Sequence, residues 1–186
     1  MATGNDGSGR APVAIVRPTT SVTSGVGVTQ KLVTAAVAFG DLMQGTFGPQ
    51  GLDKMLYKTN GETAVTNDGA KIVAELLVKH PAAKAFVQLA DAQEQACGDG
   101  VTGCLLFASE LMREAGRLLG RGLHPLVCIQ GYQTALEVAL NHLDTRSETL
   151  DNHDDRLHSI AQTAMTGTSA DTGDATLASF IVQALQ

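Results

Sequence analysis

The stretch GDGVTG, from Gly98 to Gly103, matches the glycine spacing of a dinucleotide-binding fingerprint. That fingerprint requires a strand before its first glycine and an acidic residue about 20 positions further on. Here a helical pattern precedes the loop, and no Asp or Glu occurs between Glu114 and Glu137. The stretch is therefore predicted to join two helices, which argues against an NAD site.

The same loop suits a phosphate group that is carried with a divalent cation. Gly98 and Gly100 let the backbone approach a ligand closely. The next helix begins near Asp99 or Gly100, so its free N–H groups would attract an anion. The Asp99 carboxylate would repel phosphate unless Mg²⁺ lay between them, and the Thr102 hydroxyl can donate to phosphate or cap the helix. On this loop alone, an ordinary Gly-Asp helix cap is the better interpretation.

Helical periodicity dominates the elements that must position this loop. The predicted helices cover residues 28–44, 67–77, 81–96, 101–119, 125–143 and 157–164, with a last one from Asp174. A small hairpin is predicted between Met55–Lys58 and Thr63–Thr66, because Asn60-Gly61 is a strong turn signal. Apolar helix faces at Phe39, Phe86, Phe107 and Phe180 can form one core. The terminal helix and the hairpin edge are nevertheless expected to lack packing partners, which the rest of the chain or other subunits would have to supply.

Composition narrows the class of protein. The chain has 186 residues, 44% of them hydrophobic, which is enough for one domain or one and a half. The net charge of −6 argues against nucleic acid or an anionic membrane as the main partner. No apolar run reaches the roughly 20 residues that span a bilayer, and the first ten residues resemble a flexible tail rather than a signal peptide.

Cysteine and histidine residues raise the alternative of a metal site, which the sequence supports less well. Cys97, Cys104 and Cys128 lack C-x-x-C spacing and are interpreted as reduced core thiols of an intracellular protein. His153 and His158 flank acidic residues and suggest a metal site, but a charged helix start explains them better.

The final helical pattern runs to Gln186 without a cap, so we expect the sequence to continue in a longer protein.

Three glycine-containing loops occur together with a specific order: FGPQG (47–51), TNDG (66–69) and GDGVTG (98–103). With GPQGLDKML, KHPAAK and GLHPLVCIQGY, they resemble the group II chaperonins, the archaeal thermosomes and the eukaryotic cytosolic ring chaperonin. The resemblance covers about residues 24–186. It implies a mostly α fold: a tail over 1–23, the N-terminal half of the equatorial domain over 24–145, with its small hairpin, and the start of the intermediate domain over 146–186.

Within that family, three details are reminiscent of the eukaryotic theta subunit. They are SGVG ahead of the first helix, QEQ before the glycine loop, and the unusual residues after Gly100.

The resemblance also implies a site for ATP or ADP with Mg²⁺. Asp99 matches the family's Mg²⁺ ligand, and Asp68 an acidic residue near the γ-phosphate with a catalytic role. The residues expected to contact the nucleotide are Phe47, Gly48, Pro49, Gly69, Gly98, Gly100, Val101, Thr102, Gly103, Met165, Thr166 and Gly167. A further catalytic carboxylate and the client-binding apical domain belong to parts of the family that lie beyond these residues.

Departures from the family pattern leave two functions open. Val101 and Gly103 replace two threonines, which removes two hydroxyl donors worth about 0.5–1.5 kcal/mol each. Gln50 stands where Lys is common in the family.

The first function is an ATP-dependent chaperone subunit of a cytoplasmic double ring, whose partners are other chaperonin subunits and unfolded polypeptides. The alternative is a truncated or turnover-deficient paralogue that acts as a non-enzymatic assembly or adaptor protein.

Overall fold

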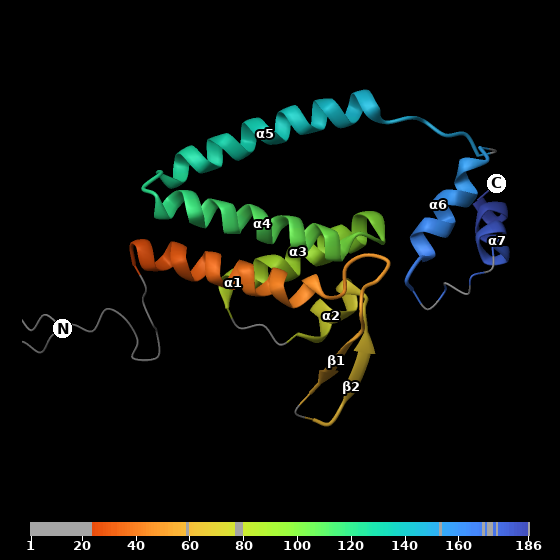
Figure 1. The fold of residues 1–186 in the computed structure, drawn as a ribbon, viewed down its shortest axis with the longest axis horizontal. Coiled ribbons are helices and arrows are strands. Elements are labelled where there is room, and N and C mark those ends of the chain that lie inside the picture. The colour runs from red at the N-terminus through yellow and green to blue at the C-terminus, as the bar shows by residue number, and fades with distance from the viewer. Residues whose placement is uncertain are drawn as a thin grey trace, which may run out of the picture.

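The computed structural model describes residues 24–58, 60–76, 80–152, 154–168, 170, 173 and 175–185. These residues form helices and one antiparallel hairpin (Figure 1). In chain order the elements are α1 (Val26–Gln44), β1 (Lys54–Tyr57), β2 (Thr63–Thr66), α2 (Gly69–Glu75), α3 (Pro81–Cys97), α4 (Val101–Gly120), α5 (Pro125–Arg146), α6 (Arg156–Met165) and α7 (Thr176–Leu185). The predicted mostly helical fold with a small hairpin is confirmed.

Local chemistry accounts for the helix starts. Asp68 caps α2, because its Oδ1 accepts hydrogen bonds from the amides of Ala70 at 2.9 Å and Lys71 at 3.4 Å. Pro125 is the first residue of α5, a position where the N–H that proline lacks would have no partner within the helix. The amide of Leu126 donates a hydrogen bond to Nδ1 of His124, the residue before the helix. α5 begins at its predicted residue, and α2 begins two residues after its predicted start at residue 67.

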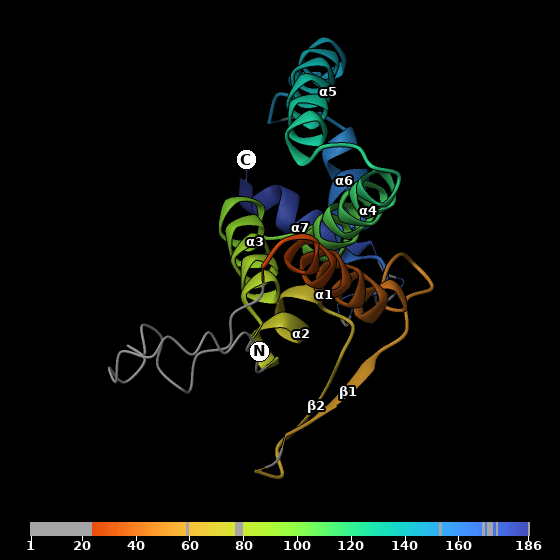
Figure 2. The same cartoon turned by 90° about the vertical axis from the view of Figure 1, so that its left-hand side faces the viewer.

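The hairpin differs from its prediction by one residue in the first strand. β1 is Lys54–Tyr57 rather than Met55–Lys58, and its register pairs Lys54 with Thr66 and Tyr57 with Thr63. Lys58 belongs to the turn instead. Its amide donates to Glu62 O at 2.9 Å, and its ammonium group pairs with both Glu62 and Glu75. In Figure 2 the hairpin projects away from the helices.

The core lies where α1, α3 and α4 meet over α2. Its buried residues are Ala36, Phe39, Met43, Ile72, Val73, Ala83, Phe86, Ala90, Val101 and Leu105. Phe39 and Phe86 contact each other with ring centroids 5.4 Å apart. The expectation that Phe107 joins them is wrong, because its side chain is 67% exposed. Phe180 of the terminal helix is 62% exposed, as expected for a helix that lacks a partner on that face. Helical periodicity identified apolar faces but not which of them have a packing partner.

Glycine permits close packing between α1 and α4. A Cβ atom placed on Gly40 would lie 2.0 Å from Ser109 Oγ, and one on Gly116 would lie 2.6 Å from Val33 Cγ1. Ser109 is fully buried, and its hydroxyl finds no hydrogen-bond partner within the described part of the chain. At the surface Arg113 of α4 pairs with Asp41 of α1 at 2.8 Å. The two helices therefore approach too closely for larger residues at the glycine positions.

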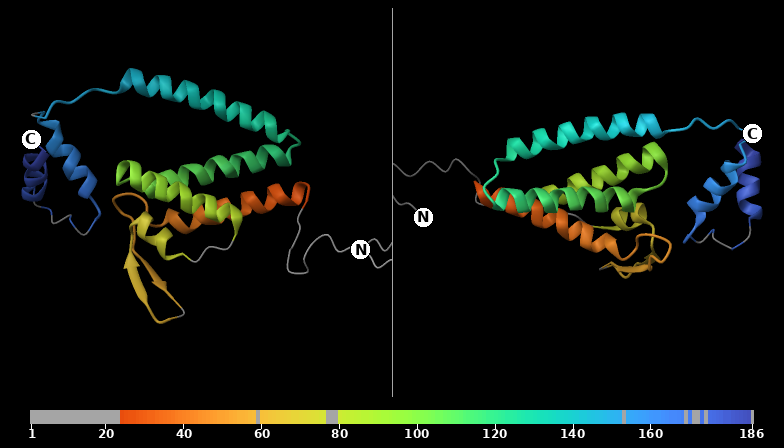
Figure 3. Two further views of the ribbon diagram at one scale, coloured as in Figure 1. Left: turned by 180° about the vertical axis from the view of Figure 1, so that it is seen from behind. Right: turned by 45° about the horizontal axis from the view of Figure 1, so that its top comes forward.

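The later helices lie outside this core, with α5 running back alongside α4 and α6 and α7 at one end (Figure 3). No residue of α5 is buried, and it is joined to α4 by a hydrogen bond from Tyr132 Oη to Leu111 O at 2.5 Å. α6 and α7 pack against each other. Among the described residues, no helix is long and apolar enough to cross a membrane.

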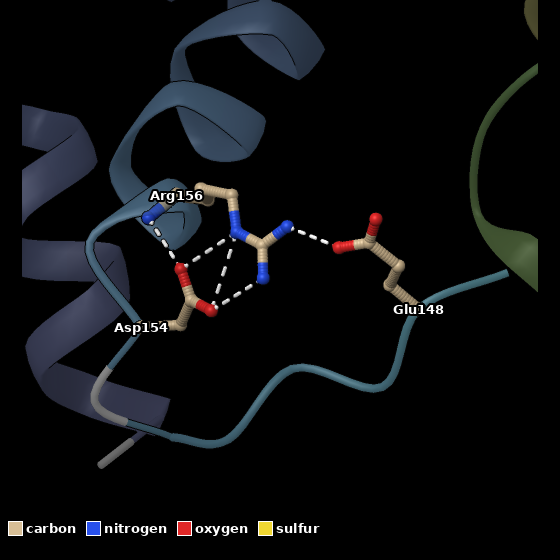
Figure 4. A network of polar contacts seen from close by, with 3 residues as sticks. All are labelled: Glu148, Asp154 and Arg156. Atoms are coloured by element: carbon tan, nitrogen blue, oxygen red, sulfur yellow. Dashed lines mark hydrogen bonds and ion pairs between the residues drawn. The ribbon is translucent and has the colours of Figure 1, made fainter.

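An ion-pair network holds the start of α6 (Figure 4). The Arg156 guanidinium pairs with Asp154 at 2.8 Å and with Glu148 at 2.5 Å, which connects α6 to the segment after α5. Hydrogen bonds from Arg156 lower the pKa of Asp154 to about 2. The described residues contain no cluster of three or more metal-binding side chains. His153 lies outside the described residues. Asp154 bonds to Arg156, the first residue of α6, which agrees with the interpretation of this stretch as a charged helix start.

The prediction of core thiols is wrong, because none of the three cysteines is among the buried residues of the core. Cys97 ends α3 with an exposed side chain, whereas Cys104 and Cys128 are half-buried. None of the three forms a disulfide. Burial raises the pKa of the Cys104 thiol, and the neighbouring Cys97 adds to that effect. Cys97 is exposed because it leads directly into the loop at residues 98–100, which contributes no core residue.

Candidate functional site

Four loops that are distant in the sequence meet at the start of α4. They comprise residues 47–51 after α1, 66–69 before α2, 98–100 before α4 and 165–168 after α6. Three pairs of residues make the contacts between them: Gly69 with Thr102, Phe47 with Gly103, and Asn67 with Gly167. The predicted nucleotide residues lie in these loops and in the first turn of α4, so the structure brings the four predicted segments together.

The first turn of α4 presents free backbone donors. Gly100 precedes the helix with φ 79° and ψ 9°, a left-handed conformation that glycine adopts without strain. Within the described chain, the first α4 amide with an acceptor is that of Cys104, which donates to Gly100 O at 2.9 Å. The amides of Val101, Thr102 and Gly103 remain available for an anion, which the positive end of the helix dipole also favours.

Asp99 is placed to carry a cation beside those donors. Its Oδ1 accepts a hydrogen bond from Gly100 N at 2.6 Å. No donor among the described residues contacts its Oδ2, and the side chain is exposed. Magnesium prefers carboxylate oxygens and binds nucleotides through one or two of them. The residues present therefore fit Mg²⁺ bound between Asp99 and a phosphate group.

Asp68 and Gly69 bring the start of α2 against the start of α4. Asp68 uses Oδ1 to cap α2, which leaves Oδ2 for other contacts. A Cβ atom on Gly69 would lie 2.4 Å from Thr102 Oγ1 and 3.0 Å from Thr102 N. Only a residue without a side chain allows this approach, so Gly69 contributes to the site by its small size.

The loop after α1 covers the other side of Gly103. A Cβ atom on Gly103 would lie 3.3 Å from Phe47 Cε2, so the Phe47 ring rests against the α4 backbone. Gly48 and Pro49 lie close to the segment at residues 165–168. A Cβ atom placed on Gly167 would lie 3.8 Å from Pro49 Cα and 3.9 Å from Gly48 O. Phe47 thus occupies space that a longer side chain at position 103 would need.

The segment after α6 reaches the site mainly through Gly167. Gly167 O accepts a hydrogen bond from Asn67 Nδ2 at 2.9 Å, across 100 positions of sequence. Thr166 instead directs its hydroxyl to Gln162 O at 3.0 Å, and Met165 O accepts from Thr168. Of the three residues predicted here, Gly167 contacts the other loops, while Met165 and Thr166 contribute to the end of α6.

Sequence reasoning missed two polar side chains at the site. Asn67 joins two of the loops, and Gln93 Nε2 donates to the Asp99 carbonyl at 2.9 Å from α3. Asn67 lies within TNDG, and Gln93 is the first residue of the QEQ stretch that precedes GDGVTG. Their partners are backbone carbonyls, which no residue pattern reveals.

Replacing Gly69 by Ala is expected to damage the site and the fold together. The new methyl group would collide with Thr102, whose backbone nitrogen cannot move without displacing α4. We expect the free energy of unfolding to fall by about 2 kcal/mol and the affinity for Mg-ADP to fall about tenfold, as the loop geometry is lost. Chemical unfolding and nucleotide titration of the native protein measure these effects.

Gly131→Ala in α5 is the matched control, because no atom lies within 4 Å of the added carbon. It should leave nucleotide affinity unchanged. Equal stability and affinity of Gly69→Ala and the unmodified protein would contradict the described contact between α2 and α4.

Comparison with known proteins identifies the family of the chain. Residues 39–186 match the TCP-1/cpn60 chaperonin family. The thermosome alpha subunit of Halobacterium salinarum is 37% identical over 179 residues, 96% of this chain and 32% of the relative. The thermosome beta subunit of Desulfurococcus mucosus is 41% identical over 135 residues, 72% of this chain and 27% of the relative. The thermosome alpha subunit of Thermoplasma acidophilum is 35% identical over 178 residues, 96% and 32% respectively.

The matches define the family and also the extent of the similarity. These relatives are archaeal thermosome subunits, and they give no support to the narrower resemblance to the theta subunit. The chain spans about a third of the length of the relatives it matches. On the match over residues 39–186 and the thermosome similarity, the chain belongs to the TCP-1/cpn60 chaperonin family, in its group II branch.

Proposed function

We propose that the chain is a subunit of an ATP-dependent chaperonin and supplies most of a Mg-ATP site. The observation that supports this most is the meeting of four loops at the start of α4. That place combines unsatisfied helix amides with the exposed Asp99 carboxylate. Anion donors and a metal-binding carboxylate are together what a nucleotide diphosphate or triphosphate with Mg²⁺ requires.

Each part of the site has its own role in this proposal. The amides of Val101, Thr102 and Gly103 bind phosphate oxygens, with the Thr102 hydroxyl as a further donor. Asp99 holds Mg²⁺, which when bound neutralises charge on the phosphates. Asp68 orients the metal or the attacking water, and the Phe47–Pro49 and Met165–Gly167 segments enclose the nucleotide. Restricting the reactants in this way is how phosphoryl transfer is accelerated.

The wider assignments follow from family membership as proposals. Residues 24–145 form the N-terminal half of an equatorial domain, and residues 146–186 begin an intermediate domain. The native assembly is a double ring of chaperonin subunits in the cytoplasm, which acts on unfolded polypeptides through a domain outside these residues. The exposed apolar side chains of the hairpin, Met55, Tyr57 and Val65, favour contact with another subunit.

A second candidate function is supported by the residues around Gly103. Val101 and Gly103 carry no hydroxyl groups, and Phe47 stands beside Gly103, where a longer side chain would meet its ring. Fewer donors to phosphate weaken the stabilisation of charge during transfer. The alternative is therefore a chaperonin-like subunit that binds nucleotide but does not turn it over, and that acts in assembly.

Asp68→Asn tests the catalytic part of the proposal. Asparagine keeps an oxygen that can cap α2, so the fold should be preserved, while the negative charge is lost. We expect ATP hydrolysis by the native assembly to fall by roughly 30-fold, with Mg-ADP affinity within about threefold of the unmodified protein. Single-turnover hydrolysis and calorimetric titration measure the two quantities.

Asp91→Asn provides the control, since Asp91 is an exposed residue of α3. Binding of Mg-ADP without any hydrolysis by the unmodified assembly would favour the second candidate. Absence of both binding and hydrolysis would overturn both candidates.

A further inference from the structure

The loop that carries Asp99 has little conformational restraint of its own. Gly98 and Gly100 flank Asp99 on both sides, and their φ angles are 65° and 79°. Glycine exchanges readily between positive and negative φ. The peptide units on either side of Asp99 can therefore rotate at low cost, which would turn the Asp99 carboxylate away from a ligand at the first turn of α4. The loop therefore needs a restraint from outside.

Gln93 supplies that restraint from α3. Its Nε2 donates to the Asp99 carbonyl oxygen at 2.9 Å. The same nitrogen lies close to Gly100, since a Cβ atom placed there would be 3.3 Å from it. On the other side of this peptide unit, the Asp99 carboxylate accepts from Gly100 N at 2.6 Å. The Asp99–Gly100 peptide is thus held at its carbonyl by Gln93 and at its amide by Asp99.

The restraint is rigid because α3 is anchored in the core. Ala83, Phe86 and Ala90 of α3 are buried, with 8%, 7% and 1% of their surface exposed. Gln93 itself is half-buried, one turn after Ala90. Because α3 is fixed by its packing in the core, a hydrogen bond from its Gln93 side chain also fixes the position of the loop. Gly98 is tied to the same helix, because its amide donates to Glu94 O at 2.8 Å.

We propose that Gln93 is a positioning residue for the metal–nucleotide site. It holds the Asp99–Gly100 peptide so that Asp99 Oδ2 faces a ligand bound at the first amides of α4, which the helix itself holds in place. The inference rests on the proposed function, because it concerns the geometry of that same site. Its specific consequence is that Gln93 supports the binding of the metal-bound nucleotide more than that of the metal-free nucleotide.

Gln93→Met is the variant that tests this role. Methionine has a similar length and a similar helix propensity but donates no hydrogen bond. In the native assembly we expect the affinity for Mg-ADP to fall about five- to tenfold, the size expected for one lost neutral hydrogen bond. The affinity for ADP in the presence of a chelator should change by less than about twofold, and the thermal midpoint without ligand should stay the same.

Gln95→Met is the matched control, since Gln95 is exposed on the same helix, and Asp99→Ala serves as the positive control. Mg-ADP affinity unchanged by Gln93→Met but lost in Asp99→Ala would overturn the role of Gln93 and leave the proposed function intact. Equal losses for both forms of ADP would also overturn it, because a general structural effect does not depend on the metal. Failure of the unmodified assembly to bind Mg-ADP would overturn both.

Discussion

Asp99→Ala is expected to abolish the magnesium dependence of nucleotide binding. The affinity for Mg-ADP should fall by at least about 300-fold, because the metal loses its carboxylate ligand from the protein. The affinity for ADP in the presence of a chelator should stay the same or rise. Without a metal the carboxylate repels phosphate, and the substitution removes that repulsion. A loss that is confined to the metal-bound nucleotide separates loss of a metal ligand from loss of the fold.

Asp99→Asn strengthens this test. Asparagine retains an oxygen that can accept from Gly100 N, so the loop should keep its conformation. It should lose the magnesium dependence nearly as completely as the alanine variant. Mg-ADP affinity in either variant equal to that of the unmodified protein, measured by titration calorimetry, would refute the assignment of Asp99 as the ligand.

The second large effect is expected at Gly40, where α1 packs on α4. A Cβ atom there would lie 2.0 Å from Ser109 Oγ and 2.5 Å from Ser109 Cβ. Since Ser109 is fully buried, the helices must separate to admit the methyl group. We expect Gly40→Ala to lower the free energy of unfolding by about 3 kcal/mol. This loss exceeds the helix propensity gained by alanine, about 1 kcal/mol.

A second substitution makes the cause identifiable. Ser109→Gly removes both clashing atoms, and Ser109 Cα lies 4.0 Å from the added carbon, an ordinary contact distance. The double variant should therefore be more stable than Gly40→Ala alone. Chemical unfolding gives the comparison, with Gly131→Ala as the control for propensity. A double variant that is no more stable than the single one would show that the contact does not cause the loss.

Much of the fold could be predicted because its signals are local. Glycine loops, the Asn60-Gly61 turn and helical periodicity identified the elements, and the helices predicted over 67–77 and 125–143 correspond to α2 and α5. Periodicity shows which face of a helix is apolar but not whether another element covers it. Phe107 and α5 illustrate the limit, because their apolar side chains remain exposed.

The candidate site could be predicted as a set of segments but not as a set of contacts. Each loop carries glycine and polar residues in a recognisable order, which is a local property. The approach of Gly69 to Thr102 and the bond from Gln93 to the Asp99 carbonyl depend on how the helices pack. Packing distances of a few ångströms follow from the whole core, so no single stretch of sequence contains them.

The central claim is that the first turn of α4 and Asp99 together bind Mg-nucleotide. It is tested most directly by an experimental structure of the native assembly with bound Mg-ADP. We expect the terminal phosphate at the amides of Val101, Thr102 and Gly103, and Mg²⁺ at about 2.0–2.1 Å from a carboxylate oxygen of Asp99. A nucleotide bound elsewhere, or a Mg²⁺ ion with no ligand from Asp99, would contradict the claim.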